Sequence, residues 1–94
     1  MAIEVRIPTI LRTYTGGEKA VDARGASLSA LIDDLDANHP GIKDRLVEAK
    51  DGAVDLRRFV NVYVGGEDIR FLDGLDTSVD DGDEVTILPA VAGG

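Results

Sequence analysis

Apolar and polar residues alternate along three stretches of the chain, residues 3–8, 58–64 and 84–88. Because a two-residue period is that of a β-strand with one buried face, each stretch predicts a strand. We expect Pro8 to end the first of them. The aliphatic residues expected to point into the core are Ile3, Val5, Ile7, Val60, Val62, Val64, Val85 and Ile87.

The regions between these strands predict shorter elements. Residues 19–23 have the pattern of a second strand, which we expect to pair with the first in the antiparallel sense. The connection before them is long, and we expect Ile10 and Leu11 within it to pack onto the core. Residues 48–55 are expected to form a surface loop.

A glycine pair follows the strand at residues 58–64. Gly65 and Gly66 supply the positive φ values that a tight hairpin turn requires. Residues 68–71 are then expected to return as a short edge strand.

One main helix is predicted between the second and third strands. Its apolar residues recur at a spacing of three and four, which places them on a single helical face. They are Leu28, Leu31, Ile32 and Leu35. Ser27 precedes them as the expected N-cap, and His39 and Pro40 mark the end of the helix. A weaker helical turn follows, with Ile42, Leu46 and Val47 as its buried side.

The order strand, strand, helix, strand, short strand, strand is typical of an α+β protein with the β-grasp, or ubiquitin-like, arrangement. We expect a mixed sheet of four to five strands with one main helix packed on one face. The last strand lies centrally and parallel to the first, so its C-terminal end projects from the sheet. We therefore expect a β-grasp domain at residues 1–89 and a flexible C-terminal Gly-Gly tail at residues 90–94.

The sheet face that the helix leaves uncovered is a candidate partner-binding surface. Aromatic and aliphatic groups gathered on an exposed face often mark an interface. The residues expected on that face or beside the tail are Arg6, Phe59, Tyr63, Leu88, Pro89 and Val91. The alternative is that one or two of these side chains fold under a loop.

Composition narrows the classes of function. The 94 residues carry a formal net charge of -8, which disfavours nucleic acid as a partner and favours a basic protein. There is no cysteine, so sulfur chemistry on this chain would have to use a group other than a thiol. Charges interrupt the N-terminal segment and no stretch reaches membrane-spanning length, so we expect a cytoplasmic protein without a membrane partner.

Conventional catalytic motifs receive little support. The acidic run at residues 80–84 lacks the ligand spacing of a calcium loop, and His39, the single histidine, has neither a nucleophile nor a ligand partner in view. The glycine pairs lack the Lys-Ser/Thr of a phosphate loop. We therefore predict no cofactor or metal on this chain and no enzymatic activity of its own.

The C-terminal stretch remains as the candidate chemical site. Residues 85–94 contain no charged side chain in a protein that is 30% charged, and the last two residues are Gly93 and Gly94. A fraying terminus is the simpler interpretation, but it explains neither the missing charges nor the preceding Pro89. The Gly94 carboxylate is ionised at neutral pH and inert toward nucleophiles, so it requires activation by another protein.

The same residues carry a resemblance to a known family. Residues 81–94, DGDEVTILPAVAGG, closely resemble the closing signature of the small β-grasp sulfur carriers, the family of the molybdopterin synthase small subunit and the thiamine sulfur carrier. Residues 7–12, 15–17, 58–64 and 88–94 are similar to the actinobacterial branch that supplies sulfur for cysteine synthesis. Ala90 stands where molybdopterin synthase subunits often have a second proline, which disfavours the molybdopterin pathway.

The resemblance implies a stoichiometric sulfur carrier. An E1-like adenylyl/sulfurtransferase would use ATP and magnesium to adenylate Gly94, after which sulfur converts it to a thiocarboxylate. A cysteine synthase with pyridoxal phosphate (PLP) would accept the sulfur onto an aminoacrylate made from phosphoserine, and a zinc metallopeptidase would release the cysteine. The ATP, magnesium, PLP and zinc belong to these partners.

Other functions stay open from the sequence alone. A molybdopterin synthase subunit or a thiamine thiazole carrier would use the same thiocarboxylate with a different acceptor. A ubiquitin-like modifier would instead join Gly94 to lysines of other proteins, and a non-covalent adaptor would not need Gly94 at all.

Overall fold

The structure of this chain is a computed structural model that describes residues 3–57 and 60–89. Along the chain, the strands are β1 (Ile3–Arg6), β2 (Ala20–Ala23), β3 (Val47–Lys50), β4 (Ala53–Leu56), β5 (Val60–Val64), β6 (Glu67–Asp68) and β7 (Glu84–Pro89). The helices are α1 (Leu28–Asn38), α2 (Ile42–Leu46) and the 3-10 helices η1 (Thr9–Thr15), η2 (Ile69–Phe71) and η3 (Gly74–Asp76).

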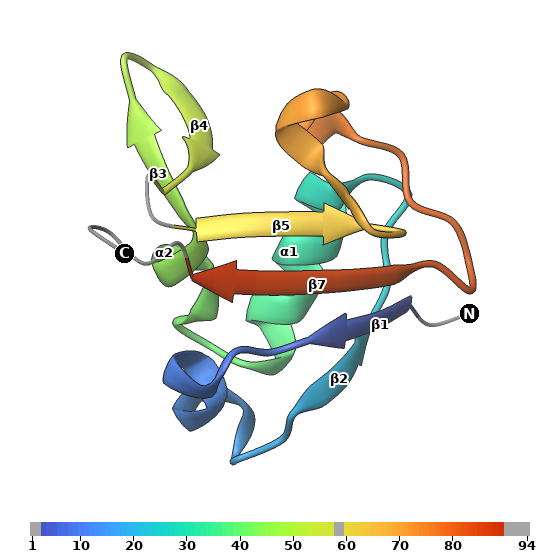
Figure 1. Cartoon of the computed structure of the whole chain (residues 1–94). Coiled ribbons are helices and arrows are strands. Elements are labelled where there is room, and N and C mark those ends of the chain that lie inside the picture. The colour runs from blue at the N-terminus through green and yellow to red at the C-terminus, as the bar shows by residue number, and fades with distance from the viewer. Residues whose placement is uncertain (1–2, 58–59, 90–94) are drawn as a thin grey trace.

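One mixed sheet organises the described residues, with strand order β2, β1, β7, β5, β6 (Figure 1). β7 lies in the middle, parallel to β1 with Val85 opposite Val5, and antiparallel to β5 with Ile87 opposite Val62. β2 pairs with β1 in the antiparallel sense. The predicted mixed sheet, with its last strand central and parallel to its first, is confirmed.

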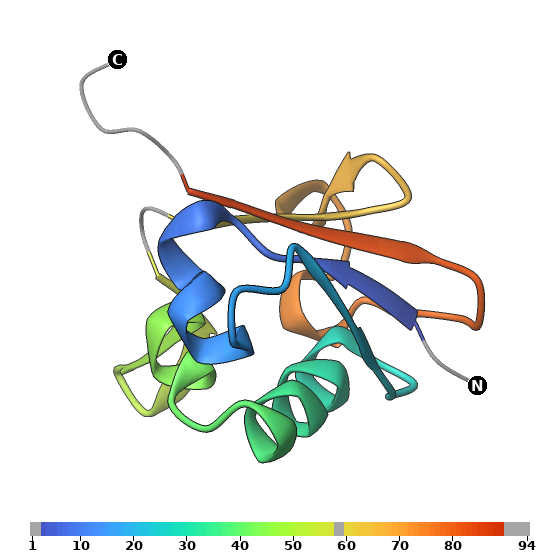
Figure 2. The same cartoon turned by 90° about the horizontal axis from the view of Figure 1, so that it is seen from below.

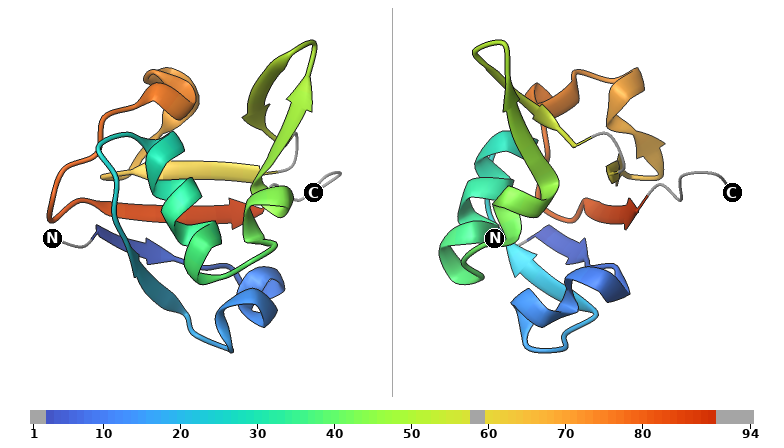
Figure 3. Two further views of the ribbon diagram at one scale, coloured as in Figure 1. Left: turned by 180° about the vertical axis from the view of Figure 1, so that it is seen from behind. Right: turned by 90° about the vertical axis from the view of Figure 1, so that its left-hand side faces the viewer.

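Helix α1 crosses one face of this sheet and leaves the other face open (Figures 2 and 3). The Ser27 hydroxyl accepts a hydrogen bond from the Ala30 N–H at 3.2 Å, so the predicted N-cap is confirmed. The four predicted helix residues are all buried in one cluster with residues of β1, β5 and β7, and Ile42 and Leu46 of α2 belong to the same cluster. The core therefore lies between α1 and the inner face of the sheet.

The expected surface loop at residues 48–55 is wrong. β3 and β4 form a separate antiparallel hairpin there, with Val47 opposite Leu56, and the hairpin projects from the body of the protein (Figure 1). Asp51 and Gly52 make its turn with φ values of 54° and 79°. Two successive positive φ values suit Asp-Gly hairpin turns. The pattern escaped detection because most of β4 is exposed and alternates weakly.

The expectation for the first connection was half right. Leu11 is buried, but Ile10 is 67% exposed because residues 9–15 form the helix η1, in which neighbouring side chains point in different directions. Thr15 closes η1 through its hydroxyl, which contacts the carbonyl oxygens of Arg12 and Glu18 at 3.2 and 2.9 Å. The exposed Ile10 therefore becomes part of the surface near the end of β7.

The expected edge strand at residues 68–71 is also too long. β6 contains only Glu67 and Asp68, and the Asp68 carboxylate then accepts the Arg70 N–H at 2.9 Å, which starts η2. Ile69 turns into the core while Phe71 is 87% exposed. The predicted turn at Gly65 and Gly66 is confirmed, with φ values of 59° and 88°.

We predict that Gly25→Ala is strongly destabilising. A Cβ at Gly25 would lie 2.5 Å from the Leu31 backbone nitrogen, so the first turn of α1 would have to shift. We expect the free energy of unfolding to fall by about 3 kcal/mol, as in overpacked cores, measured by urea unfolding. Gly52→Ala is the control, because nothing lies near its Cβ and only its positive φ costs about 1 kcal/mol. Equal losses for the two variants would contradict the close approach at Gly25.

Candidate functional site

The end of β7 is the fixed base from which residues 90–94 continue. Val85 and Ile87 are 1% and 3% exposed on the inner face, while the backbone of β7 pairs with β1 and β5. The predicted site residues Gly93, Gly94, Val91 and Phe59 lie outside the described residues. Leu88 and Pro89 are described at the end of β7, and Tyr63 lies opposite Thr86 in the middle of that strand.

Pro89 is part of β7, although the sequence placed the end of the strand at residue 88. Pro89 lies opposite Val60. The Gly65 N–H donates to the Glu84 carbonyl at 3.0 Å, and hydrogen-bonded pairs alternate along an antiparallel ladder, so the pair of Val60 and Pro89 is one without mutual hydrogen bonds. Proline fits there because the ladder requires no N–H from it.

The uncovered face of the sheet brings together outward side chains from three strands. The register places Arg6 beside Thr86 and Thr86 beside Tyr63. Leu88 follows Thr86 on the same face and is 45% exposed. The Arg6 Nε lies 3.2 Å from the Glu84 Oε2, so the charge of Arg6 is compensated on this face. The predicted grouping of Tyr63 and Leu88 on one uncovered face is thus present in the fold.

Arg70 is a residue of this face that sequence reasoning missed. Its guanidinium donates to the Asn61 side-chain oxygen and, at 2.7 Å, to the Val60 carbonyl. The Val60 carbonyl points away from β7, toward the edge that the short β6 leaves uncovered, because Val60 and Pro89 share no hydrogen bonds. Arg70 therefore covers the free edge of β5 beside the end of β7. No spacing rule predicts a contact across this irregular connection.

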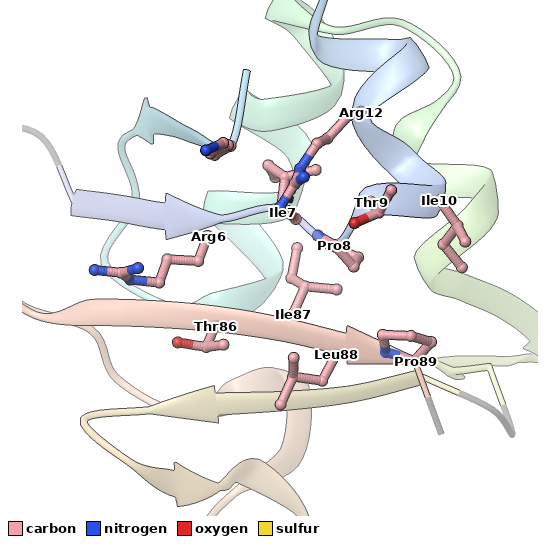
Figure 4. Close-up of a pocket in the computed structure, with 11 residues that line it drawn as sticks. Arg6, Ile7, Pro8, Thr9, Ile10, Arg12, Thr86, Ile87, Leu88 and Pro89 are labelled. Atoms are coloured by element: carbon pink, nitrogen blue, oxygen red, sulfur yellow. Dashed lines mark hydrogen bonds between the residues drawn. The ribbon is translucent and has the colours of Figure 1, made fainter. Parts of the chain in front are cut away.

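A groove of about 430 Å³ lies on the other side of the end of β7 (Figure 4). β1 makes its last pair with β7 at Arg6 and Thr86, so the final residues of β7 have no strand beside them on that side. Helix η1 forms the opposite wall. The lining residues are Arg6, Ile7, Pro8, Thr9, Ile10, Arg12, Lys19, Thr86, Ile87, Leu88 and Pro89.

The η1 wall of this groove is held in place by contacts to the rest of the fold. Arg45 of α2 donates to the Tyr14 hydroxyl at 2.7 Å, and this hydrogen bond raises the pKa of Arg45 above its ordinary value. Arg12 donates from Nε to the Ile7 carbonyl at 3.2 Å. The groove is therefore bounded by two anchored elements.

The described residues offer recognition surfaces instead of catalytic groups. Among residues 3–57 and 60–89, no three His, Cys, Asp or Glu side chains gather in a way that could hold a metal ion. In the same part of the chain, no helix has the length and apolar character needed to cross a membrane. The arrangement can present an extended segment to another protein from a rigid base.

Comparison with known proteins assigns the family. The sequence profile of the ThiS family matches residues 5–94, which include β7 and the C-terminal residues. The chain belongs to the ThiS family. Within the family, it is 56% identical to the sulfur carrier protein CysO of Mycobacterium tuberculosis over 94 residues, which are 100% of both chains. This ThiS-family protein is a sulfur carrier with a β-grasp fold, not a catalyst.

Two further relatives share the fold or the sequence. A crystal structure of the Amycolatopsis orientalis BexX/CysO complex contains a chain 58% identical to this ThiS-family protein, with 99% of this chain and 100% of that chain covered and a TM-score of 0.90. Small archaeal modifier protein 3 of Haloferax volcanii is 36% identical over 97 residues, which cover 100% of both proteins.

We predict that Arg70 stabilises the sheet edge beside the end of β7. Hydrogen bonds from a charged group contribute about 1.5 to 3 kcal/mol, and the Arg70 side chain is 42% exposed, so Arg70→Ala should lower the free energy of unfolding by about 1 kcal/mol. Hydrogen exchange should also accelerate along β5. Arg24→Ala is the control, because Arg24 is exposed and follows β2, at the sheet edge opposite to β6. If the two variants unfold at the same urea concentration, Arg70 does not have this role.

Proposed function

We propose that this protein carries sulfur as a thiocarboxylate on Gly94 and delivers it for cysteine biosynthesis. The observation that carries the proposal is the 56% identity, over the full length of both chains, to a protein named as a sulfur carrier. The position of Pro89 at the tip of a central strand supports it, because the residues that follow start from a rigid base. The proposed cycle takes place in the cytoplasm.

In this proposal, residues 1–89 bind the partner protein and residues 90–94 carry the reacting group into its active site. Residues 90–94 can reach at most about 16 to 18 Å beyond Pro89 when extended, which is enough to enter a partner's active site while the body stays outside. Glycine at positions 93 and 94 leaves the reacting carbonyl accessible. Tyr63 and Leu88 on the uncovered face supply part of the docking surface, and the complex of a relative with BexX is consistent with a protein partner.

The first chemical step activates the carboxylate. An E1-like enzyme with ATP and magnesium forms a bond between a Gly94 carboxylate oxygen and the α-phosphorus of ATP, and pyrophosphate leaves. Hydrosulfide, or a persulfide with a reductant, then attacks the acyl carbon, and AMP leaves with that oxygen. The product is a Gly94 thiocarboxylate. Because the chain has no cysteine, no side-chain thiol competes for the activated carbonyl.

The second half of the cycle transfers the sulfur. In the proposed scheme, a PLP-dependent synthase removes phosphate from phosphoserine to give an aminoacrylate, and the thiocarboxylate sulfur adds to its β-carbon. The resulting thioester passes its acyl group to the amine of the new cysteine, which forms an amide at Gly94. A zinc metallopeptidase hydrolyses that amide with water, releases cysteine and restores the carboxylate.

One observation supports a second candidate function. The 36% identity to a small archaeal modifier protein favours a role in which activated Gly94 acylates a lysine amine. Adenylation is shared by the two functions, and they differ only in the nucleophile that follows. An immunoblot of cell extract would show a ladder of conjugates for the modifier and a single band for a carrier alone.

We predict that incubation with the E1-like enzyme, MgATP and sulfide replaces one oxygen of this chain by sulfur. Intact-mass spectrometry measures the change directly. A variant lacking Gly94 is the control, and it should stay folded because its core is untouched, but should gain no sulfur. An unchanged mass of the wild-type chain, with an activating enzyme that is active on its own carrier, would contradict the carrier function.

The acceptor separates the pathways. With phosphoserine and the PLP-dependent synthase added, the thiocarboxylate form should gain the mass of one aminoacrylate. Its product should then be one cysteine residue heavier than the unmodified chain. A stable complex with a molybdopterin synthase large subunit, and no cysteine adduct, would assign the protein to molybdopterin synthesis instead.

A further inference from the structure

The groove between η1 and the end of β7 has features that the proposed chemistry does not use. We infer that it binds an apolar segment bearing carboxylate side chains, contributed by the enzyme that activates Gly94. The inference rests on the proposed function and specifies a surface for its first step. The activating enzyme is the expected occupant because both a thiocarboxylate and an isopeptide bond at Gly94 require prior activation of the carboxylate.

The groove exists because β1 and β7 diverge after the pair of Arg6 and Thr86, before β7 ends. The Ile7 N–H donates to the Lys19 carbonyl at 2.8 Å, so the chain after β1 turns toward β2. Pro8 follows and has no N–H to offer β7. By the alternation of the ladder, the Ile87 carbonyl points to this side of β7, beyond its last pair with β1. The edge of β7 therefore borders the groove without a strand of its own to cover it.

Apolar side chains stand on both walls of the groove. Ile10 on η1 is 67% exposed, and Leu88 on β7 is 45% exposed. Figure 4 shows Ile10 and Pro8 on the η1 side and Leu88 and Pro89 on the β7 side. A single exposed aliphatic residue is ordinary, but these residues line one hollow. An apolar segment of a partner would cover them beside the start of the tail.

The charge of the groove specifies the partner further. The lining residues include Arg6, Arg12 and Lys19 and no carboxylate, in a chain with 18 acidic and 10 basic residues. Arg6 pairs with Glu84, whereas Arg12 and Lys19 make no ion pair within residues 3–57 and 60–89. Two uncompensated cations on one hollow of an acidic protein favour a partner with carboxylates there.

This charge pattern changes the expectation from composition alone. The net charge of -8 favours a basic partner for the protein as a whole. The groove instead carries local positive charge, next to Pro89, where β7 ends. An activating enzyme that matched both features would be basic over most of its contact surface and acidic where it meets η1.

The test is a steady-state assay of thiocarboxylate formation with the purified activating enzyme. Lys19→Glu and Ile10→Ser should each raise the KM for the carrier about tenfold while kcat stays within about twofold, because they weaken docking and leave Gly94 intact. The effect of Lys19→Glu should shrink as salt rises, since exposed charges are screened.

Matched variants keep the test specific. Arg24→Glu makes the same charge change on an exposed side chain between β2 and α1. Val54→Ser removes an aliphatic group that is 55% exposed on the β3–β4 hairpin. We expect both controls to keep the wild-type KM. Thermal unfolding of all four variants checks that they remain folded.

The outcomes separate the two proposals. If the wild-type chain gains sulfur and the groove variants have the same KM as their controls, the groove is not the docking site and the inference is wrong. If the wild-type chain gains no sulfur at all, the carrier function itself is wrong, whatever the variants do. A rise in KM for Arg24→Glu equal to that for Lys19→Glu would show a general charge effect and also overturn the inference.

Discussion

The pairing of β7 between β1 and β5 is the interaction on which the rest of the structure depends. It joins the last described residues to the first strand of the chain, and it places Val85 and Ile87 over the core opposite α1. Loss of the pairing with either β1 or β5 would expose that core. The end of β7 at Pro89 is therefore held by its pairing with β5.

This constraint explains how a small fold can serve group transfer without catalytic side chains. The reactive group of the proposed cycle belongs to the main chain at Gly94, and the proposal assigns activation and sulfur transfer to other proteins. The body contributes position and recognition. Tyr63 and Leu88 lie on the uncovered face. The groove along η1 offers a second surface, whose positive charge is opposite in sign to the net charge of the protein.

Strong periodic patterns predicted most of the fold. The helix, its Ser27 cap and the central last strand followed from alternation and from three-and-four spacing, and each is confirmed. Most of the predicted core residues are buried as well, whereas Val60 and Val64 are only partly buried. The β3–β4 hairpin was missed because its strands are mostly exposed and their pattern is weak. The prediction that Ile10 is buried was wrong because the connection after Pro8 forms a 3-10 helix. These errors arise where tertiary position, not periodicity, decides burial.

The candidate site was predictable to a different extent. The Gly-Gly end and its uncharged approach are features of the sequence, and they pointed to Gly94 before any fold was known. Arg70 was not predictable, since its hydrogen bonds to Val60 and Asn61 depend on how β6 ends. The groove was hidden as well, because it depends on β1 ending before β7 does.

The most direct test of the account is to purify the chain from cells that make cysteine from phosphoserine and to fragment the intact protein in a mass spectrometer. The chain has one methionine and no cysteine, so added sulfur is easily recognised. The account predicts that the extra sulfur, or the attached cysteine, appears only in fragments that contain Gly94. A modification on an internal residue, or sulfur retained after Gly94 is removed, would contradict it.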